Sequence, residues 1–182
     1  VMFQARGYHG TPMRTLARHL RIEAASLYYH FPSKQRILCD LFDRTMDDLN
    51  DGLERVIGGE PTPEAKLRAA VRFHVLFHTD RQGEAFVSHS EIRSLTAANR
   101  QRLVTKRDRY ERTWRSLLSE GVRLGSFDIR DIQVTTIAIL MMCSGVSDWF
   151  SRVGRLTADD VAETYVDLVL RQVRPSARPG SR

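Results

Sequence analysis

The side chains that could take part in chemistry are few and widely spaced. His74 and His78 are four residues apart, so they share one face of a helix and their imidazoles could bind one metal ion. His89 lies further along, but no cysteine or carboxylate cluster completes such a site. The two cysteines, Cys39 and Cys143, are 104 positions apart, and no Ser-His-Asp, Cys-His or paired-carboxylate arrangement is present. We therefore expect a non-enzyme without bound metal or cofactor, whose histidines form a polar wall.

The basic residues gather at the N-terminal end. The 182 residues include 28 lysines and arginines against 22 aspartates and glutamates, a formal charge of +6. Residues 1–38 hold six of these cations and one acidic residue, Glu23, whereas residues 39–170 hold 18 cations and 21 acidic residues. A basic segment on a near-neutral body indicates a module that meets a polyanion. A solvated arginine-rich face is the alternative that charge alone leaves open.

Two short helices are predicted within this basic segment. Thr11 followed by Pro12 is a helix start signal with Thr as N-cap, and apolar spacing predicts helices over 12–20 and 24–30. Because only three residues join them, the segment predicts a helix-turn-helix. The residues expected where the two helices cross are small or apolar: Ala17, Leu20, Ile22 and Leu27.

Apolar residues at helical spacing continue through the rest of the chain, without the alternation of a β-strand. We expect an all-α protein of about nine helices. Its domains are an N-terminal three-helix domain over 1–45 with a truncated first helix, a helical domain over 46–173 and a flexible tail over 174–182. The further predicted helices cover 34–56, 63–78, 84–95, 99–124 and 129–150, and a last one starts at Thr157.

Local end signals support these boundaries. Ser33 can cap the helix from Lys34, Gly125 can end the helix from 99, and Thr157 with Asp160 forms a shortened capping box. The most apolar stretch, 132–150, is interrupted by polar residues and is expected to be a buried or interface helix, not a bilayer span. We expect a cytoplasmic protein without membrane contact.

Three stretches carry a resemblance to a known family: Gly7-Tyr8-His9-Gly10-Thr11, Leu16-Ala17, and the run from Leu27 to Lys34. About the first 45 residues closely resemble the DNA-binding domain of TetR-family transcriptional regulators. The resemblance implies a homodimer on palindromic double-stranded operator DNA, with a helical domain for ligand binding and dimerisation. The expected DNA-contacting positions are Thr11, Arg14, Ala24, Ala25, Ser26, Tyr28, Tyr29, His30 and Lys34.

The expected roles of these positions differ. By the resemblance, Arg14 and Ala24 meet base edges, and Thr11 and Tyr29 touch phosphate; Lys34, in the first turn of a helix, also suits phosphate. Of the adjacent Tyr28 and Tyr29, we expect one ring to be buried and the other exposed.

Two residues depart from the family pattern. Arg21 stands where the turn usually carries glycine, so a left-handed backbone there would be strained. Glu23 replaces the usual Ser or Thr at the start of the recognition helix, although its carboxylate could still cap that helix.

The dimer interface is expected on the last two long helices, where four helices from two chains would form a bundle. Alternatively, these apolar stripes fill the core of one protomer. The residues assigned to the interface are Val134, Ile137, Met141 and Gly145 on one helix, and Val161, Tyr165, Leu168 and Val169 on the other.

An effector cavity is expected between the remaining helices, with aromatic and Met side chains as adaptable walls. Its predicted lining is Phe73, Phe77, Phe86, Glu91, Trp114, Met142 and Trp149, although an aromatic or Met residue at helical spacing belongs more often to the core than to a pocket.

The C-terminal part also resembles acyl-CoA-sensing regulators of fatty-acid and steroid catabolism, through the stretches 91–95, 106–110 and 149–157. This implies a hydrophobic small-molecule effector, such as a CoA thioester, that releases a repressor from DNA. The alternatives are a sensor of aromatic or cationic drugs, and a ligand-binding helical bundle without operator binding. Four cations could hold CoA phosphates but are expected in surface ion pairs: Arg93, Arg102, Lys106 and Arg109.

Overall fold

The computed structural model describes residues 2–175, and within that range it contains helices and no strand, which confirms the all-α prediction. Most of the predicted tail, from residue 176 on, lies outside the described residues. The elements are α1 (Met2–Arg6), α2 (Met13–Leu20), α3 (Ala24–His30), α4 (Lys34–Gly58), α5 (Pro63–Asp80), α6 (Gln82–Ser90), the 3-10 turn η1 (Ile92–Ser94), α7 (Ala97–Arg123), α8 (Ile132–Ser144), α9 (Val146–Trp149) and α10 (Ala158–Val173).

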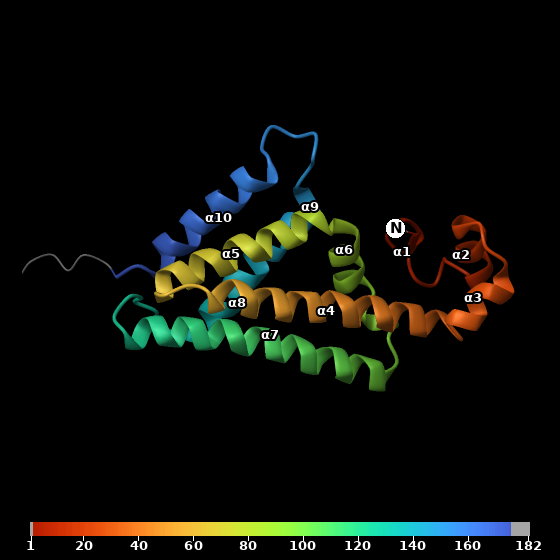
Figure 1. Ribbon diagram of the computed structural model, residues 1–182, viewed down its shortest axis with the longest axis horizontal. Coiled ribbons are helices and arrows are strands. Elements are labelled where there is room, and N and C mark those ends of the chain that lie inside the picture. The colour runs from red at the N-terminus through yellow and green to blue at the C-terminus, as the bar shows by residue number, and fades with distance from the viewer. Residues whose placement is uncertain (1, 176–182) are drawn as a thin grey trace, which may run out of the picture.

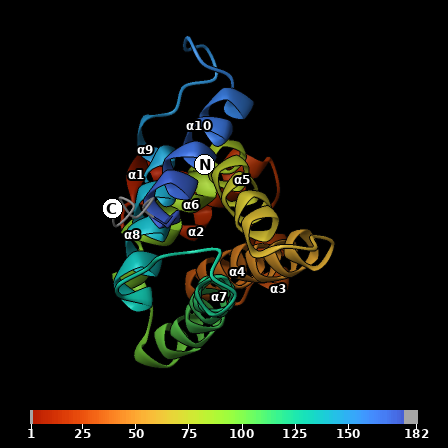
Figure 2. The ribbon, with the colours of Figure 1, turned by 90° about the vertical axis from the view of Figure 1, so that its left-hand side faces the viewer.

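The helices form a small N-terminal group and a larger body (Figure 1). α1, α2 and α3 gather at one end of the molecule, and α4 runs from that end into the body. There α4 packs between α5 and α7, and α10 packs along the other side of α5 (Figures 1 and 2). One continuous helix therefore belongs to both parts.

The sequence explains why α4 is long and straight. Its apolar stripe includes Leu38, Phe42, Leu49 and Leu53, all buried in the main core. The hydroxyl of Ser33 accepts a hydrogen bond from the Arg36 amide at 3.2 Å, which confirms the predicted cap. Neither proline nor glycine interrupts the first four turns, so the stripe stays in register along both parts of the chain.

The N-terminal group has a core of its own, which is smaller than predicted. Ala17 and Leu27 are buried together with Met13. Leu20 and Ile22, also expected at the helix crossing, are exposed instead. The physical reason is the position of the crossing: Leu27 packs on Met13 and Ala17, one turn earlier along α2, so Leu20 and the turn after it extend beyond the contact.

Two predicted helix boundaries are corrected. The helix expected over 129–150 begins at Ile132 and breaks at Gly145. At the break the Ser147 hydroxyl donates a hydrogen bond to the Ser144 carbonyl in place of a backbone amide. A single further turn, α9, follows. Thr11 does not cap α2; the Pro12 carbonyl accepts the first amides of that helix. The capping box of Thr157 with Asp160 is confirmed.

Backbone geometry in the helix-turn-helix is strained at one residue. Arg21 has φ 57° and ψ 40°, in the left-handed region, and is the one non-glycine residue with positive φ among residues 2–175. Gly125, which follows α7, has φ +74° and takes the same region without a Cβ. The departure from glycine at position 21 therefore carries the predicted conformational cost.

Replacing Arg21 by glycine should stabilise the protein. Relief of the left-handed strain is worth about 1 kcal/mol, which raises Tm by roughly 2–4 °C for a chain of this size. The matched control is Arg18→Gly, an exposed position inside α2, which should destabilise by about 1 kcal/mol. Thermal unfolding followed by circular dichroism measures both; a Tm that falls in Arg21→Gly would contradict the strain.

Candidate functional site

The outer surface of α3 presents polar and aromatic side chains. Tyr28 and Tyr29 are 49% and 86% exposed, so the expectation that one ring is buried is wrong. α3 has seven residues and buries one side chain, Leu27, so both neighbouring tyrosines fall outside its buried face. Three other predicted groove-facing residues of α3 are exposed as well: Ala25, Ser26 and His30. Ala24 is half-buried.

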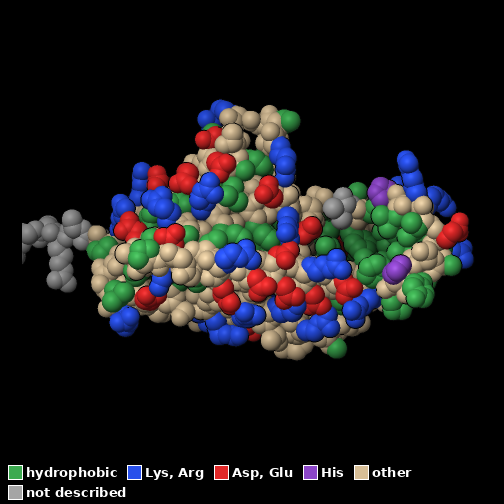
Figure 3. All heavy atoms as spheres, in the orientation of Figure 1, with side chains coloured by type: hydrophobic (Ala, Val, Ile, Leu, Met, Phe, Trp, Pro, Cys, Tyr) green, Lys and Arg blue, Asp and Glu red, His purple; other side chains and the backbone are tan. Residues whose placement is uncertain are grey.

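Basic residues lie on the same end of the molecule (Figure 3). Arg14 is exposed on α2, as a residue that meets a base edge must be. Thr11 is fully buried, and its hydroxyl donates to the Gly7 carbonyl at 2.7 Å. The predicted contact of Thr11 with phosphate is therefore corrected: this side chain closes the turn between α1 and α2.

Lys34 lies at the first residue of α4 and is half-buried. Its ammonium donates to the Tyr8 carbonyl at 2.6 Å and lies 4.2 Å from the centroid of the Tyr8 ring. Lys34 thus ties the turn after α1 to the start of α4. The predicted cap by Glu23 is also corrected, since its side chain makes no capping hydrogen bond to α3.

A polar joint, made of Tyr8, Gln35, Glu91 and Ser94, connects the N-terminal group to the body. Glu91 accepts hydrogen bonds from the Tyr8 amide at 2.9 Å and from the Ser94 hydroxyl at 2.7 Å. Gln35 donates from its amide to the Tyr8 hydroxyl at 3.1 Å and to the Ser94 carbonyl at 2.5 Å. Glu91, predicted to line the effector cavity, is therefore a joint residue, because the turn after α6 carries it toward α1.

A cavity of about 200 Å³ lies where α4, α5, α6, α7 and α8 meet. Its lining combines apolar side chains with histidines and further polar groups. The lining residues are Thr45, Met46, Leu49, His74, Phe77, His78, Ala85, Ser88, His89, Arg107, Tyr110, Glu111, Leu140 and Ser144.

Of the predicted cavity residues, only Phe77 lines this space. Trp114 is fully buried in the core, with its ring edge-on to His74. The Phe73 ring packs so closely on Gly52 of α4 that a Cβ at that glycine would clash.

The other three predicted cavity residues also lie elsewhere. Met142 packs half-buried against the core, while Phe86 and Trp149 are exposed. Helical spacing identified which apolar side chains point into the body, but it could not show which of them line the cavity.

The predicted polar wall of histidines does border the cavity. The Nδ1 and Nε2 atoms of His74 lie 2.8 Å from the Tyr110 hydroxyl and 3.0 Å from the Ser144 hydroxyl. His78 donates from Nδ1 to the His74 carbonyl at 2.8 Å, and the two rings stack at 4.2 Å. Both ring nitrogens of His74 are thus engaged, and residues 2–175 contain no group of three His, Cys, Asp or Glu side chains suited to a metal ion.

Burial keeps these imidazoles uncharged. It lowers the pKa of His78 to about 4, with a smaller lowering by His89 and an opposing hydrogen bond to the His74 backbone. Burial also lowers the pKa of His74 well below its usual value, helped by His78 and His89. The wall is therefore polar but neutral at neutral pH.

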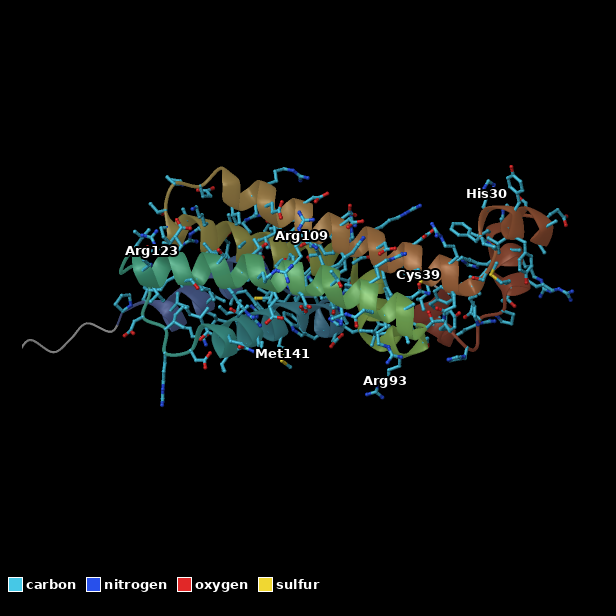
Figure 4. The ribbon with its side chains drawn as sticks, turned by 90° about the horizontal axis from the view of Figure 1, so that it is seen from below. His30, Cys39, Arg93, Arg109, Arg123 and Met141 are labelled. Carbon is cyan, nitrogen blue, oxygen red and sulfur yellow. The ribbon has the colours of Figure 1, made fainter. Side chains whose placement is uncertain are left out.

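An apolar face on α8 and α10 lies open on the outside of the body. Val134 and Met141 are 62% and 72% exposed, and Met141 points away from the body (Figure 4). Ile137 and Leu168 are exposed too, while Val161 and Val169 are fully buried in the core of the protomer. The last two assignments to an interface are therefore corrected, because those side chains point toward α5.

Two more residues assigned to the interface are half-buried: Gly145 and Tyr165, whose ring stacks with that of Trp149 at 6.5 Å. The window Ile132–Trp149 is long and apolar enough to cross a membrane by length and composition, and 28% of it is buried. One such helix is weak evidence of a span, since helices of water-soluble proteins pass the same test.

A helix-turn-helix with an exposed second helix, joined by a continuous helix to a body that encloses a cavity, defines a DNA-binding regulator with a ligand-binding domain. Comparison with known families agrees. The model of bacterial regulatory proteins of the tetR family matches residues 1–41, and that of the tetracyclin repressor-like C-terminal domain matches residues 60–173. The chain belongs to the TetR family of transcriptional regulators, and it is not an enzyme.

Several relatives cover nearly the whole chain. The HTH-type transcriptional repressor KstR2 of Rhodococcus jostii is 26% identical over 173 residues, covering 93% of this chain and 84% of the relative. The structure of PfmR from Thermus thermophilus has a TM-score of 0.86 at 30% identity, covering 93% of both chains. AibR, in complex with isovaleryl coenzyme A and operator DNA, has a TM-score of 0.83 at 26% identity, covering 92% and 91%.

The buried histidine predicts how stability depends on pH. Unfolded His78 titrates near 6.5 and folded His78 near 4, so the unfolded chain binds more protons between these values. The contribution of a neutral His78 is complete above about 6.5 and is lost as pH falls toward 4, by about 3 kcal/mol. His78→Gln has no imidazole at this position, so this part of the pH dependence should vanish. The free energy of unfolding of the parent should therefore fall more steeply on acidification and approach that of the variant.

Urea unfolding at pH 7, 6, 5 and 4 measures the convergence. His30→Gln, an exposed histidine on α3, is the matched control and should follow the parent at every pH. Parallel curves for parent and His78→Gln would contradict a neutral buried His78.

Proposed function

We propose that the chain is a cytoplasmic homodimeric repressor that binds a palindromic operator and leaves it when a hydrophobic effector, such as a fatty-acyl or steroid-derived CoA thioester, enters the cavity. The observation that carries this proposal is the position of α6. Ser88 and His89 of α6 border the cavity, and Glu91, two residues further on, holds the Tyr8 amide of the DNA-binding end. The segment 88–91 therefore contacts both the cavity and the DNA-binding end, so a ligand in the cavity can change the position of the helix-turn-helix.

Operator binding is supported by the surface of α3. A recognition helix needs small or hydrogen-bonding side chains toward the major groove, and Ala25, Ser26, Tyr28 and His30 are exposed there. Arg14 on α2 lies free to reach a guanine edge. The half-buried Lys34 keeps donors beyond the one that it gives to Tyr8, since an ammonium has three.

Dimerisation is supported by the apolar face of Val134, Ile137, Met141 and Leu168. Three of these exposed side chains follow one another along α8, and a row of large apolar side chains open to solvent marks an interaction surface. One helix-turn-helix reads one half-site, so a second copy on this face supplies the second recognition helix.

The effector class is supported by the relatives. AibR was solved with isovaleryl coenzyme A, and KstR2 of Mycobacterium tuberculosis is described as a ketosteroid regulator. Three of the four cations expected in ion pairs form them across α4 and α7. The fourth, Arg93, forms no ion pair with the described residues and points outward (Figure 4). Those pairs join Arg102 to Asp43, Lys106 to Asp43 and Asp47, and Arg109 to Glu54. Coupling between cavity and operator is expected at ~1–3 kcal/mol and acts equally in both directions.

Removing Arg14 should weaken specific DNA binding. Arg14→Ala loses the hydrogen bonds to a base edge, a cost of about 1–3 kcal/mol per half-site with relaxed specificity at that position. Fluorescence anisotropy on a palindrome selected from random duplexes measures the affinity. The matched control is Arg36→Ala, a cation of the same domain held by Asp40 at 2.9 Å, which should change little. No binding of the parent to any duplex at low salt would favour a ligand-binding bundle without operator binding.

A charge on the open face of α8 should separate the dimer. Val134→Glu with Met141→Glu places two carboxylates in an apolar interface, where burying unpaired charge costs several kcal/mol. Light scattering after size exclusion should show the monomer mass of 20.9 kDa in place of the dimer mass. Leu20→Glu is the control: it also replaces an exposed apolar side chain by a carboxylate, but on α2 at the opposite end (Figure 1). A dimer that survives the double substitution would place the interface elsewhere.

A further inference from the structure

Arg107 differs from the other cations along the middle of α7. Arg102, Lys106 and Arg109 each pair with a carboxylate of α4. Arg107 has no carboxylate partner among the described residues; it donates to the Ser88 carbonyl at 2.9 Å and lines the cavity. Of these four cations, the one that lines the cavity is therefore the one without a carboxylate partner among the described residues.

The surroundings of Arg107 do not neutralise it. Burial lowers the pKa of its guanidinium, and no acidic group acts in the opposite direction; an arginine nevertheless stays charged in proteins. Glu111, the carboxylate on the cavity wall, is held by Arg115 one turn along. Arg107 is half-buried, and its one hydrogen bond goes to a neutral carbonyl. Because a charge that is partly removed from water is stabilised by an opposite charge, an anion in the cavity would complete this site.

Ser88 supplies a second unsatisfied group at the same place. Its hydroxyl oxygen is buried and has no hydrogen-bond partner, while its carbonyl already accepts from Arg107. Buried polar atoms without partners are rare and call for an explanation. A hydroxyl donor beside a guanidinium fork matches the two oxygens of a carboxylate.

The apolar lining residues determine the rest of the ligand. Met46, Leu49, Phe77 and Leu140 offer apolar contact, and the volume of about 200 Å³ is below the ~300–1,000 Å³ of pockets for drug-sized ligands. We propose that the effector is a short-chain acid whose free carboxylate binds Arg107 and Ser88 and whose hydrocarbon part lies on these four side chains. A cationic drug does not fit beside Arg107.

This inference rests on the proposed function and specifies its effector. The carboxylate can belong to a free acid or to the free end of a dicarboxylic acyl-CoA, and both present the same chemistry to Arg107. Hexanoate and hexanamide differ in charge but not in length, and adipoyl-CoA and hexanoyl-CoA differ by the distal carboxylate. These two matched pairs separate recognition of the carboxylate from recognition of coenzyme A.

Titration calorimetry on the full chain tests the proposal. Hexanoate, adipoyl-CoA or both should bind at least about 30-fold more tightly than the counterpart that lacks this carboxylate, hexanamide or hexanoyl-CoA. Arg107→Gln should remove that difference, as expected when one partner of a charge pair is lost. Lys106→Gln, the neighbouring cation held by Asp47, is the matched control and should bind like the parent. If Arg107→Gln does not fold, Ser88→Ala should still weaken the carboxylate ligand selectively.

The outcomes separate the two proposals. Equal affinity for adipoyl-CoA and hexanoyl-CoA, together with no binding of hexanoate, overturns the carboxylate site and leaves an acyl-CoA-responsive repressor standing. Failure of every carboxylate probe to bind also overturns it. Operator binding measured without ligand reports on the proposed repressor independently of all four probes.

Discussion

The placement of the DNA-binding end depends on the polar joint between distant parts of the chain, in which the Glu91 carboxylate accepts a hydrogen bond from the Tyr8 amide. The core of α2 and α3 is too small to fix their position, since it buries only Met13, Ala17 and Leu27. A peptide N–H that loses its acceptor in a partly buried place costs about 1–3 kcal/mol, so Glu91 holds the turn after α1 against the body. Gln35 and Ser94 complete this joint and orient the carboxylate.

The joint makes α6 the short path from cavity to DNA. Arg107 holds the Ser88 carbonyl on α6, and a carboxylate in the cavity competes for the same guanidinium. A ligand that draws the guanidinium of Arg107 away from this carbonyl would loosen a contact between α7 and α6, three residues before Glu91. α4 adds a second path, because Met46 and Leu49 border the cavity while its first turn carries Lys34 beside Tyr8. Both paths end at the same turn, so the coupling does not depend on bending the long helix.

Local interactions were predictable from the sequence, and distant ones were not. The caps at Ser33 and Thr157 form as expected because donor and acceptor lie three residues apart. Tyr8 and Glu91 are 83 positions apart, and no periodic pattern marks such a pair. Helical spacing likewise identified Trp114 as inward-facing, but only packing shows that it belongs to the core while His74 and His78 border the cavity. The prediction that one of the two tyrosines of α3 is buried failed because this helix is short. Its seven residues bury one side chain, Leu27, so both tyrosines are exposed.

The distribution of charge follows from the same packing. Acidic residues of α4 pair with cations of α7 along the exposed seam between these helices. Such exposed pairs add little stability, ~0–1 kcal/mol each, but each of them neutralises a cation of the body. The cations of α2 have no such partners, since Glu23 is the one acid in residues 1–38. Positive potential is therefore concentrated where α3 lies, which draws a polyanion to the recognition helix first. Inside the body, no carboxylate of α4 pairs with Arg107. An anion that enters the cavity therefore meets a positive charge that has no acidic partner among the described residues.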